Sequence, residues 1–172
     1  MVGAMTRWFA VVLFAAACVA AAPAALACER HGPAVGPEPS IDSAPRFAWP
    51  VRGTLVTDMC SDGSERRFTG IDIAVPEGTA VGAAADGLVL YAGNELKDYG
   101  NVVLIGHDGD WVTAYAYVEN LQVKRGDLVR QGDIIAFSGH SVAIGTPLLH
   151  FEIRRKSSPV DPLRLLPERH DG

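Results

Sequence analysis

The stretch Asn101–Val118, "NVVLIGHDGDWVTAYAYV", joins two strand-length runs of apolar and β-branched residues through the turn residues Asp108 to Asp110. Similar runs flank it and are separated by glycine, among them "IDIAV", "GLVLYAG", "DIIAFSG" and "LLHFEIR". No window of about a dozen residues shows a 3.6-residue apolar stripe bounded by helix caps. The sequence therefore predicts an all-β fold, a compact antiparallel β-sheet or β-sandwich.

Two features refine this prediction near the C-terminal end. In "VKRGDLVRQGDIIAFSG" the pairs Gly126-Asp127 and Gly132-Asp133 stand six residues apart, which predicts two tight chain reversals in a short span. The closing "VDPLRLLPERHDG" favours one short helical turn, with its aliphatic residues packed on the sheet.

The first 27 residues are typical of an export signal. Arg7 precedes an unbroken apolar stretch, and Ala25-Leu26-Ala27 is the small-x-small pattern that signal peptidase accepts. A transmembrane anchor is the alternative, because the stretch is about long enough to cross a bilayer, but Pro23 and the many alanines favour cleavage. We expect a signal peptide over residues 1–27 and a periplasmic or secreted protein of the bacterial cell envelope.

Cleavage there would leave two cysteines, Cys28 and Cys60, which can form a disulfide in an exported protein. Cys28 directly follows the cleavage pattern and could instead carry a lipid that anchors the protein to a membrane. Without Arg7 the chain has fourteen Lys and Arg against 20 Asp and Glu, so nucleic acid is not an expected partner.

The remaining chain divides by composition. Residues 28–47 are rich in proline and lack apolar periodicity, as in an extended linker. We expect one folded domain over residues 48–166 and a short tail over residues 167–172.

The domain resembles a known family from Trp49 to Pro162, in the family's order and spacing. The segments that carry the resemblance are "WPVRG", "GIDIAVPEGTAVGAAADGLVLYAG", "YGNVVLIGHDGDWVTAYAYV", "VKRGDLVRQGDIIAFSG" and "LLHFEIRR" followed by "VDP". They are similar to the lysostaphin-like, LytM-type zinc metallopeptidases, which cut peptidoglycan cross-bridges. The resemblance implies the LytM fold, a duplicated hybrid motif built of β-strands.

In active members, a His-x-Gly-x-Asp segment and the second His of a His-x-His strand hold the zinc. The His that ends a Tyr-Ala-His segment and the first His of the His-x-His pair assist catalysis. The matching positions here are Phe68, Asp72, Tyr117, Leu148 and His150. One of three zinc-ligand positions and both catalytic histidines are therefore replaced.

These replacements predict a domain without zinc-dependent catalysis. A catalytic zinc needs three protein ligands and an open position for water, and only Asp72 and His150 remain. Neither Leu148 nor Tyr117 supplies an acid or base that titrates near neutral pH. We expect no metal and no cofactor, a hydrogen bond between His150 and Asp72, and an apolar groove lined by Phe68, Tyr117 and Leu148.

A further histidine, His140 in "SGHSVAIG", lies on the expected loop before the last strand and could approach this groove. A stray surface imidazole is the commoner case. Its recruitment as a replacement ligand stays an open alternative.

Degenerate members of the resembled family, the EnvC- and NlpD-type factors, activate cell-wall amidases during septum splitting. The resemblance implies a catalytically inactive factor that activates a peptidoglycan amidase by protein binding. One alternative is a module that binds peptidoglycan without an enzyme partner. Residual zinc-dependent endopeptidase activity is the third interpretation.

Overall fold

The protein is represented by a computed structural model that describes residues 41, 43–56, 70–95, 99–141 and 145–169. The expected signal peptide, Cys28, Cys60 and Phe68 lie outside these residues.

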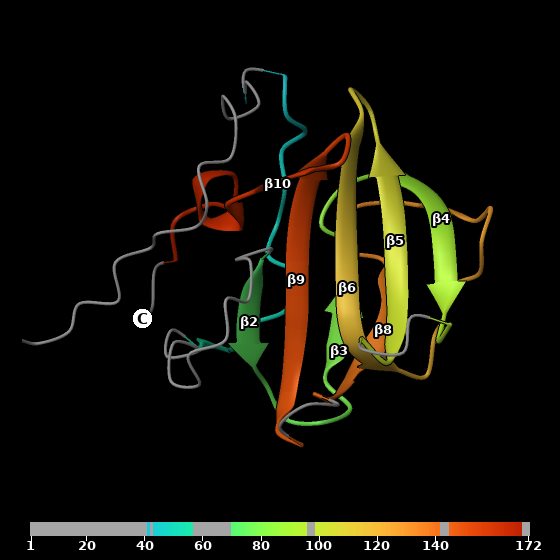
Figure 1. Cartoon of the computed structure of the whole chain (residues 1–172), viewed down its shortest axis with the longest axis vertical. Helices are drawn as coiled ribbons and strands as arrows, with labels where there is room; N and C mark the ends of the chain where they lie inside the picture. The colour runs from blue at the N-terminus through green and yellow to red at the C-terminus, as the bar shows by residue number, and fades with distance from the viewer. Residues whose placement is uncertain (1–40, 42, 57–69, 96–98, 142–144, 170–172) are drawn as a thin grey trace, which may run out of the picture.

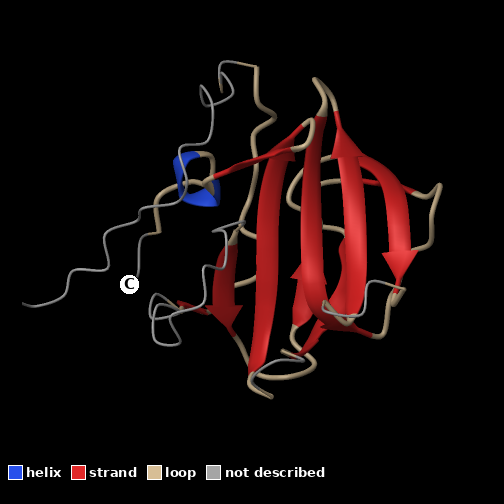
Figure 2. Cartoon of the chain, in the orientation of Figure 1, coloured by secondary structure: helices blue, strands red, loops and turns tan. Residues whose placement is uncertain are grey.

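The described part of the chain is a β structure with one short 3₁₀ helix (Figures 1 and 2). The elements are β1 (Thr54–Leu55), β2 (Ile71–Ala74), β3 (Ala80–Gly82), β4 (Gly87–Gly93), β5 (Asn101–His107), β6 (Trp111–Glu119), β7 (Leu128–Val129), β8 (Ile134–His140), β9 (Pro147–Arg155), β10 (Ser158–Val160) and η1 (Pro162–Arg164). All their pairings are antiparallel. The predicted all-β antiparallel fold is confirmed. Among these residues no helix is long and apolar enough to cross a membrane.

The strands follow the order β1-β2-β9-β8-β6-β5-β4-β7, with β10 beside β9 and β3 beside β8. In Figure 1, β9, β6, β5 and β4 form the front of the molecule, and β3 and β8 lie behind them. Strand β6 connects the two parts, since it pairs with β9 from Trp111 to Ala116 and with β8 from Val118 onward. Between these pairings Tyr117 has a φ of 58°, and the register to β5 shifts there. This bulge turns the strand, so that the sheet folds back on itself.

Buried and outward-facing side chains alternate along the strands, and this alternation places the hydrophobic core between the front strands and the strands behind them. On β9, Leu149, Phe151 and Ile153 are fully buried in the main hydrophobic cluster, while the intervening residues face outward. The cluster also contains Ile73, Val81, Val103, Ile105, Trp111, Tyr115 and Ile135. Burial of each large apolar side chain contributes about 1.5–3 kcal/mol, so this cluster is the main source of stability.

The two predicted Gly-Asp reversals are present and have the same construction. Gly126 and Gly132 have φ values of 93° and 87°, which side chains with a Cβ rarely adopt. In each turn the following aspartate accepts a hydrogen bond from a backbone N–H three residues earlier: Asp127 from Lys124, at 3.0 Å, and Asp133 from Arg130, at 2.8 Å. These turns place the short strand β7 beside β4.

The folded unit extends beyond the bounds expected from composition. Phe47, placed in the linker by its proline-rich surroundings, is 4 % exposed and belongs to the core cluster. At the other end, Pro167 accepts a hydrogen bond from Trp49 Nε1 at 2.9 Å, and the Arg169 guanidinium lies 4.0 Å from the centre of that indole ring. Proline content is a poor guide here because an extended segment can still bury an aromatic side chain. The predicted packing of the closing residues holds for Leu165 and Leu166, which lie against the core, but not for Leu163, which is 40 % exposed.

Candidate functional site

A row of paired residues crosses the outer face of the sheet. Asp72 on β2 is opposite His150 on β9, His150 is opposite Ala116 on β6, and Ala116 is opposite Val102 on β5. We call this outer surface the site face; it comprises Asp72, Val102, Leu104, Ala114, Ala116, Leu148, His150 and Glu152. The alanines of β6 are small, so the longer side chains of β9 can lie over them.

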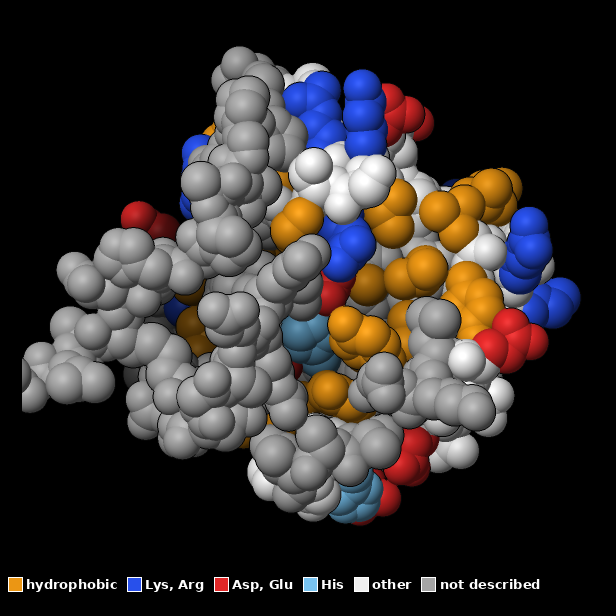
Figure 3. Space-filling view, in the orientation of Figure 1, with side chains coloured by type: hydrophobic (Ala, Val, Ile, Leu, Met, Phe, Trp, Pro, Cys, Tyr) orange, Lys and Arg blue, Asp and Glu red, His pale blue; other side chains and the backbone are white. Residues whose placement is uncertain are grey.

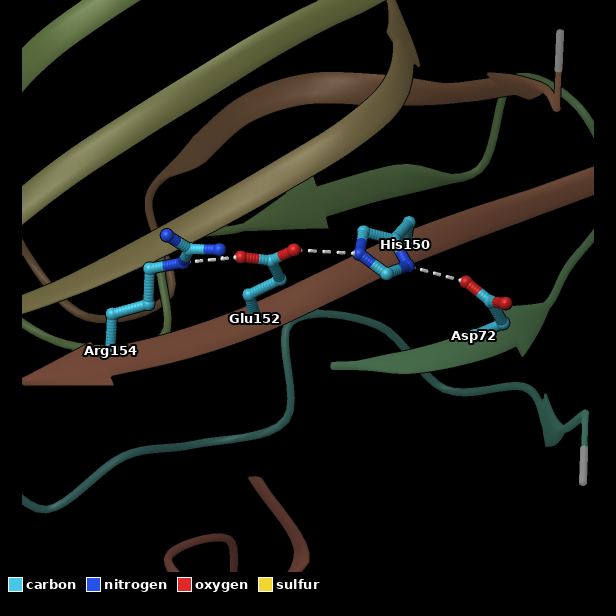
Figure 4. A network of polar contacts seen from close by, with 4 residues as sticks. All are labelled: Asp72, His150, Glu152 and Arg154. Atoms are coloured by element: carbon cyan, nitrogen blue, oxygen red, sulfur yellow. Dashed lines mark hydrogen bonds and ion pairs between the residues drawn. The ribbon is translucent and has the colours of Figure 1, made fainter. Parts of the chain in front are cut away.

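His150 is the centre of a linear polar network on this face (Figure 4). Its Nδ1 is 2.7 Å from Asp72 Oδ1, and its Nε2 is 3.1 Å from Glu152 Oε1. The other oxygen of Glu152 accepts a hydrogen bond from Arg154 Nε at 2.6 Å. The predicted bond between His150 and Asp72 is therefore present, and two further residues extend it into a chain of alternating charges.

The network keeps the imidazole of His150 protonated. Burial alone would lower its pKa, but the hydrogen bonds and negative charges of Asp72 and Glu152 outweigh that effect and raise the pKa to about 9. At neutral pH both ring nitrogens then donate, one to each carboxylate. The His150 side chain is only 15 % exposed, and those of Asp72 and Glu152 are 11 % and 5 % exposed, so water screens these charges weakly.

This raised pKa predicts a decrease in stability at alkaline pH. In the unfolded chain a histidine loses its proton near pH 6.5, whereas His150 in the folded domain holds it to about 9. The resulting stabilisation is full below pH 6.5 and is lost as the pH rises through 9, by roughly 3 kcal/mol. Denaturant unfolding between pH 6 and 10 measures it, and a His150→Gln variant should lack this pH dependence. An equal dependence in that variant would assign the proton to another group.

Two tyrosines flank the imidazole. The rings of Tyr99 and Tyr117 each have their centres 6.1 Å from that of His150. The expected position of Tyr117 beside His150 is thus present. Leu148, in contrast, is 1 % exposed, so it does not offer the apolar area expected of it. Figure 3 shows that exposed hydrophobic side chains instead gather beside a histidine and over β5 and β4.

The other described histidines lie elsewhere. His107 has a pKa lowered by burial, and its two ring nitrogens contact the Asp86 carbonyl, at 2.7 Å, and the Thr113 hydroxyl, at 2.8 Å. These contacts are those of a structural histidine. The imidazole of His140 lies between Glu77 and Glu119, with Nε2 3.3 Å from Glu77 and Nδ1 3.9 Å from Glu119. The carboxylates that contact His140 thus differ from those that contact His150.

Sequence reasoning found Asp72, His150 and Tyr117 but missed Glu152, Arg154 and Tyr99. The sequence does contain a signal for Glu152 and Arg154. In "LHFEIR" the polar residues recur at every second position from His150, which places them on one face of a strand. Tyr99 has no such signal, because it precedes β5 and approaches His150 only through the folded backbone.

A family model described as "Peptidase family M23" matches residues 66–162, more than half of the chain. The chain belongs to peptidase family M23. The M23 domain spans the site face and every strand from β2 to β10, and the predicted resemblance to LytM-type enzymes is confirmed.

Two curated proteins and one solved structure are similar to this chain. It is 44 % identical over 138 residues to a lipoprotein NlpD/LppB homolog of Pseudomonas aeruginosa, covering 80 % of this chain and 42 % of that protein. It is 43 % identical over 124 residues to the murein hydrolase activator NlpD of Escherichia coli, covering 72 % of this chain and 32 % of that protein. The catalytic domain of lysostaphin from Staphylococcus simulans superimposes with a TM-score of 0.54 at 25 % identity, covering 70 % of this chain and 86 % of that one. The chain thus spans less than half the length of these two sequence relatives.

The described M23 residues do not fit the zinc ion that the family implies. Two donors bound to one zinc at about 2.0–2.2 Å in tetrahedral geometry lie about 3.3–3.5 Å apart. His150 Nδ1 and Asp72 Oδ1 are 2.7 Å apart, the length of a charge-assisted hydrogen bond. The third ligand position holds Phe68, which lies outside the described residues and has no donor atom.

Proposed function

We propose that this protein is a catalytically inactive M23 factor of the cell envelope that activates a peptidoglycan amidase by binding it. The observation that supports this most is the network around His150. Both of its ring nitrogens are engaged by carboxylates of the protein itself, so the imidazole is available neither as a ligand nor as a base. The names of the relatives are consistent with this function, since the Escherichia coli protein is a murein hydrolase activator.

The site face then acts as a contact surface. Its charges are balanced within the network, because Asp72 and Glu152 are matched by His150 and Arg154. Beside them lie the half-buried side chain of Leu104, which is separated from Glu152 by Ala114, and the exposed ring of Tyr99. A surface with apolar and aromatic area and internally paired charges suits protein contact better than chemistry on a polar substrate.

Release of dye from labelled peptidoglycan sacculi tests this function. The protein alone, a periplasmic amidase alone and the two together are compared at equal concentrations. We expect no release by the protein alone, and release by the mixture about 5- to 150-fold above the amidase alone, the range of typical coupling energies.

Two other results would contradict the proposal. Release by the protein alone that a chelator abolishes would establish a working zinc peptidase. Cosedimentation with sacculi, without any effect on the amidase, would establish a peptidoglycan-binding module.

A further inference from the structure

A second group of potential metal ligands lies apart from the His150 network. One donor atom each from Glu77, Glu119 and His140 lies within 4.8 Å of the other two. The residues come from three elements: Glu77 from the turn after β2, Glu119 from the end of β6 and His140 from the end of β8. We propose that these three side chains form a binding site for a divalent transition-metal ion of the zinc class.

Backbone hydrogen bonds fix the segments that bear Glu77 and His140. The turn Pro76–Thr79 is attached to Ser138 of β8: the Ser138 hydroxyl donates to the Pro76 carbonyl at 2.7 Å and accepts from the Thr79 N–H at 3.0 Å. Ser138 is fully buried. His140 is two residues further along β8, on the same side of the strand, so Glu77 and His140 keep a fixed relative position.

Glu119 is fixed by a different feature. Its strand pairs with β8 at Phe137, and its side chain passes over Gly139. A Cβ at Gly139 would come within 2.6 Å of Glu119 Cγ, so glycine provides the space that the carboxylate needs to approach His140. Glu119 and His140 therefore stand on strands, and Glu77 stands on a turn that is hydrogen-bonded to β8, which favours a preformed site.

The donor set indicates the class of ion. An imidazole with two carboxylates suits Zn²⁺ and its transition-metal neighbours, whereas Mg²⁺ and Ca²⁺ prefer oxygen ligands throughout. His140 Nε2 and Glu77 Oε2 are 3.3 Å apart, close to the separation of about 3.3–3.5 Å between two ligands of one zinc ion, whereas the Glu119 carboxylate lies 3.9 Å from the other ring nitrogen, Nδ1. The side chains are about half exposed, so water can complete the coordination and an ion can enter directly.

Zinc titration of the chelator-treated protein, without an affinity tag, tests the site. We expect one zinc per chain, no competition by Ca²⁺, and perturbation of the His140 side-chain NMR signals. His140→Ala, Glu119→Gln and Glu77→Gln should each weaken binding at least about tenfold, while Asp72→Asn leaves it unchanged. Because the three side chains are half exposed, these variants should fold.

The opposite pattern would overturn the proposal. Zinc binding that survives His140→Ala, or that disappears in Asp72→Asn, would place the ion elsewhere. Absence of binding by the unmodified protein would leave His140 as a simple ion-pair partner of Glu77 and Glu119. None of these results bears on amidase activation, so the two proposals fail independently.

Discussion

Replacement of Glu152 by alanine should destabilise the domain by about 3–5 kcal/mol, the usual cost of removing one partner of a buried ion pair. The Glu152 side chain is 5 % exposed and binds His150 through one oxygen and Arg154 through the other. Its loss leaves an imidazolium and a guanidinium close together without the anion between them. Because a domain of this size is stable by about 5–15 kcal/mol, the variant should unfold at a much lower urea concentration.

Two further variants give this measurement its control. Glu95→Ala removes a carboxylate from an exposed position and should change stability by less than about 0.5 kcal/mol. Glu152→Gln keeps the shape and one acceptor oxygen but not the charge, and should lie between Glu152→Ala and the unmodified protein. A loss below about 1 kcal/mol in Glu152→Ala would mean that water or another anion replaces the carboxylate.

The strands and much of the candidate site were predictable because both depend on local pattern. Alternation in "LLHFEIR" fixes which side chains of β9 face the core, and the resemblance aligns Asp72 with His150. Glu152 lies in the same alternation, on the face of β9 that carries His150, but it is not at one of the family's ligand positions. A network of four charges is recognised only when the partner of each buried charge is sought.

Other features could not be read from the sequence because they depend on contacts between distant segments. Tyr117 adopts a positive φ, which a tyrosine rarely does. This conformation is required only because β6 pairs with β9 before Tyr117 and with β8 after it. The burial of Phe47 likewise depends on the Trp111 ring, whose centre is 6.0 Å from its own. The composition of residues 28–47 predicts an extended chain, which is compatible with this contact but does not reveal it.

Replacement of Leu104 by aspartate should remove most of the amidase activation under the proposed function. Leu104 is half-buried on β5, opposite Ala114 of β6, and lies on the apolar part of the site face. Binding of the amidase would bury the new carboxylate without a partner. This burial costs about 2 kcal/mol or more, so it reduces the affinity for the amidase about 30-fold. In the sacculus assay this appears as a higher concentration for half-maximal activation.

The matched control is Ile134→Asp. Ile134 is 52 % exposed and begins β8, which lies behind the front strands in Figure 1. The same charge placed there should leave activation unchanged, and both variants should unfold within about 1 kcal/mol of the unmodified protein. Loss of activation in both variants would indicate a general effect of added negative charge. Retention in both would show that the amidase binds away from the site face, and the balanced network around His150 would then serve stability alone.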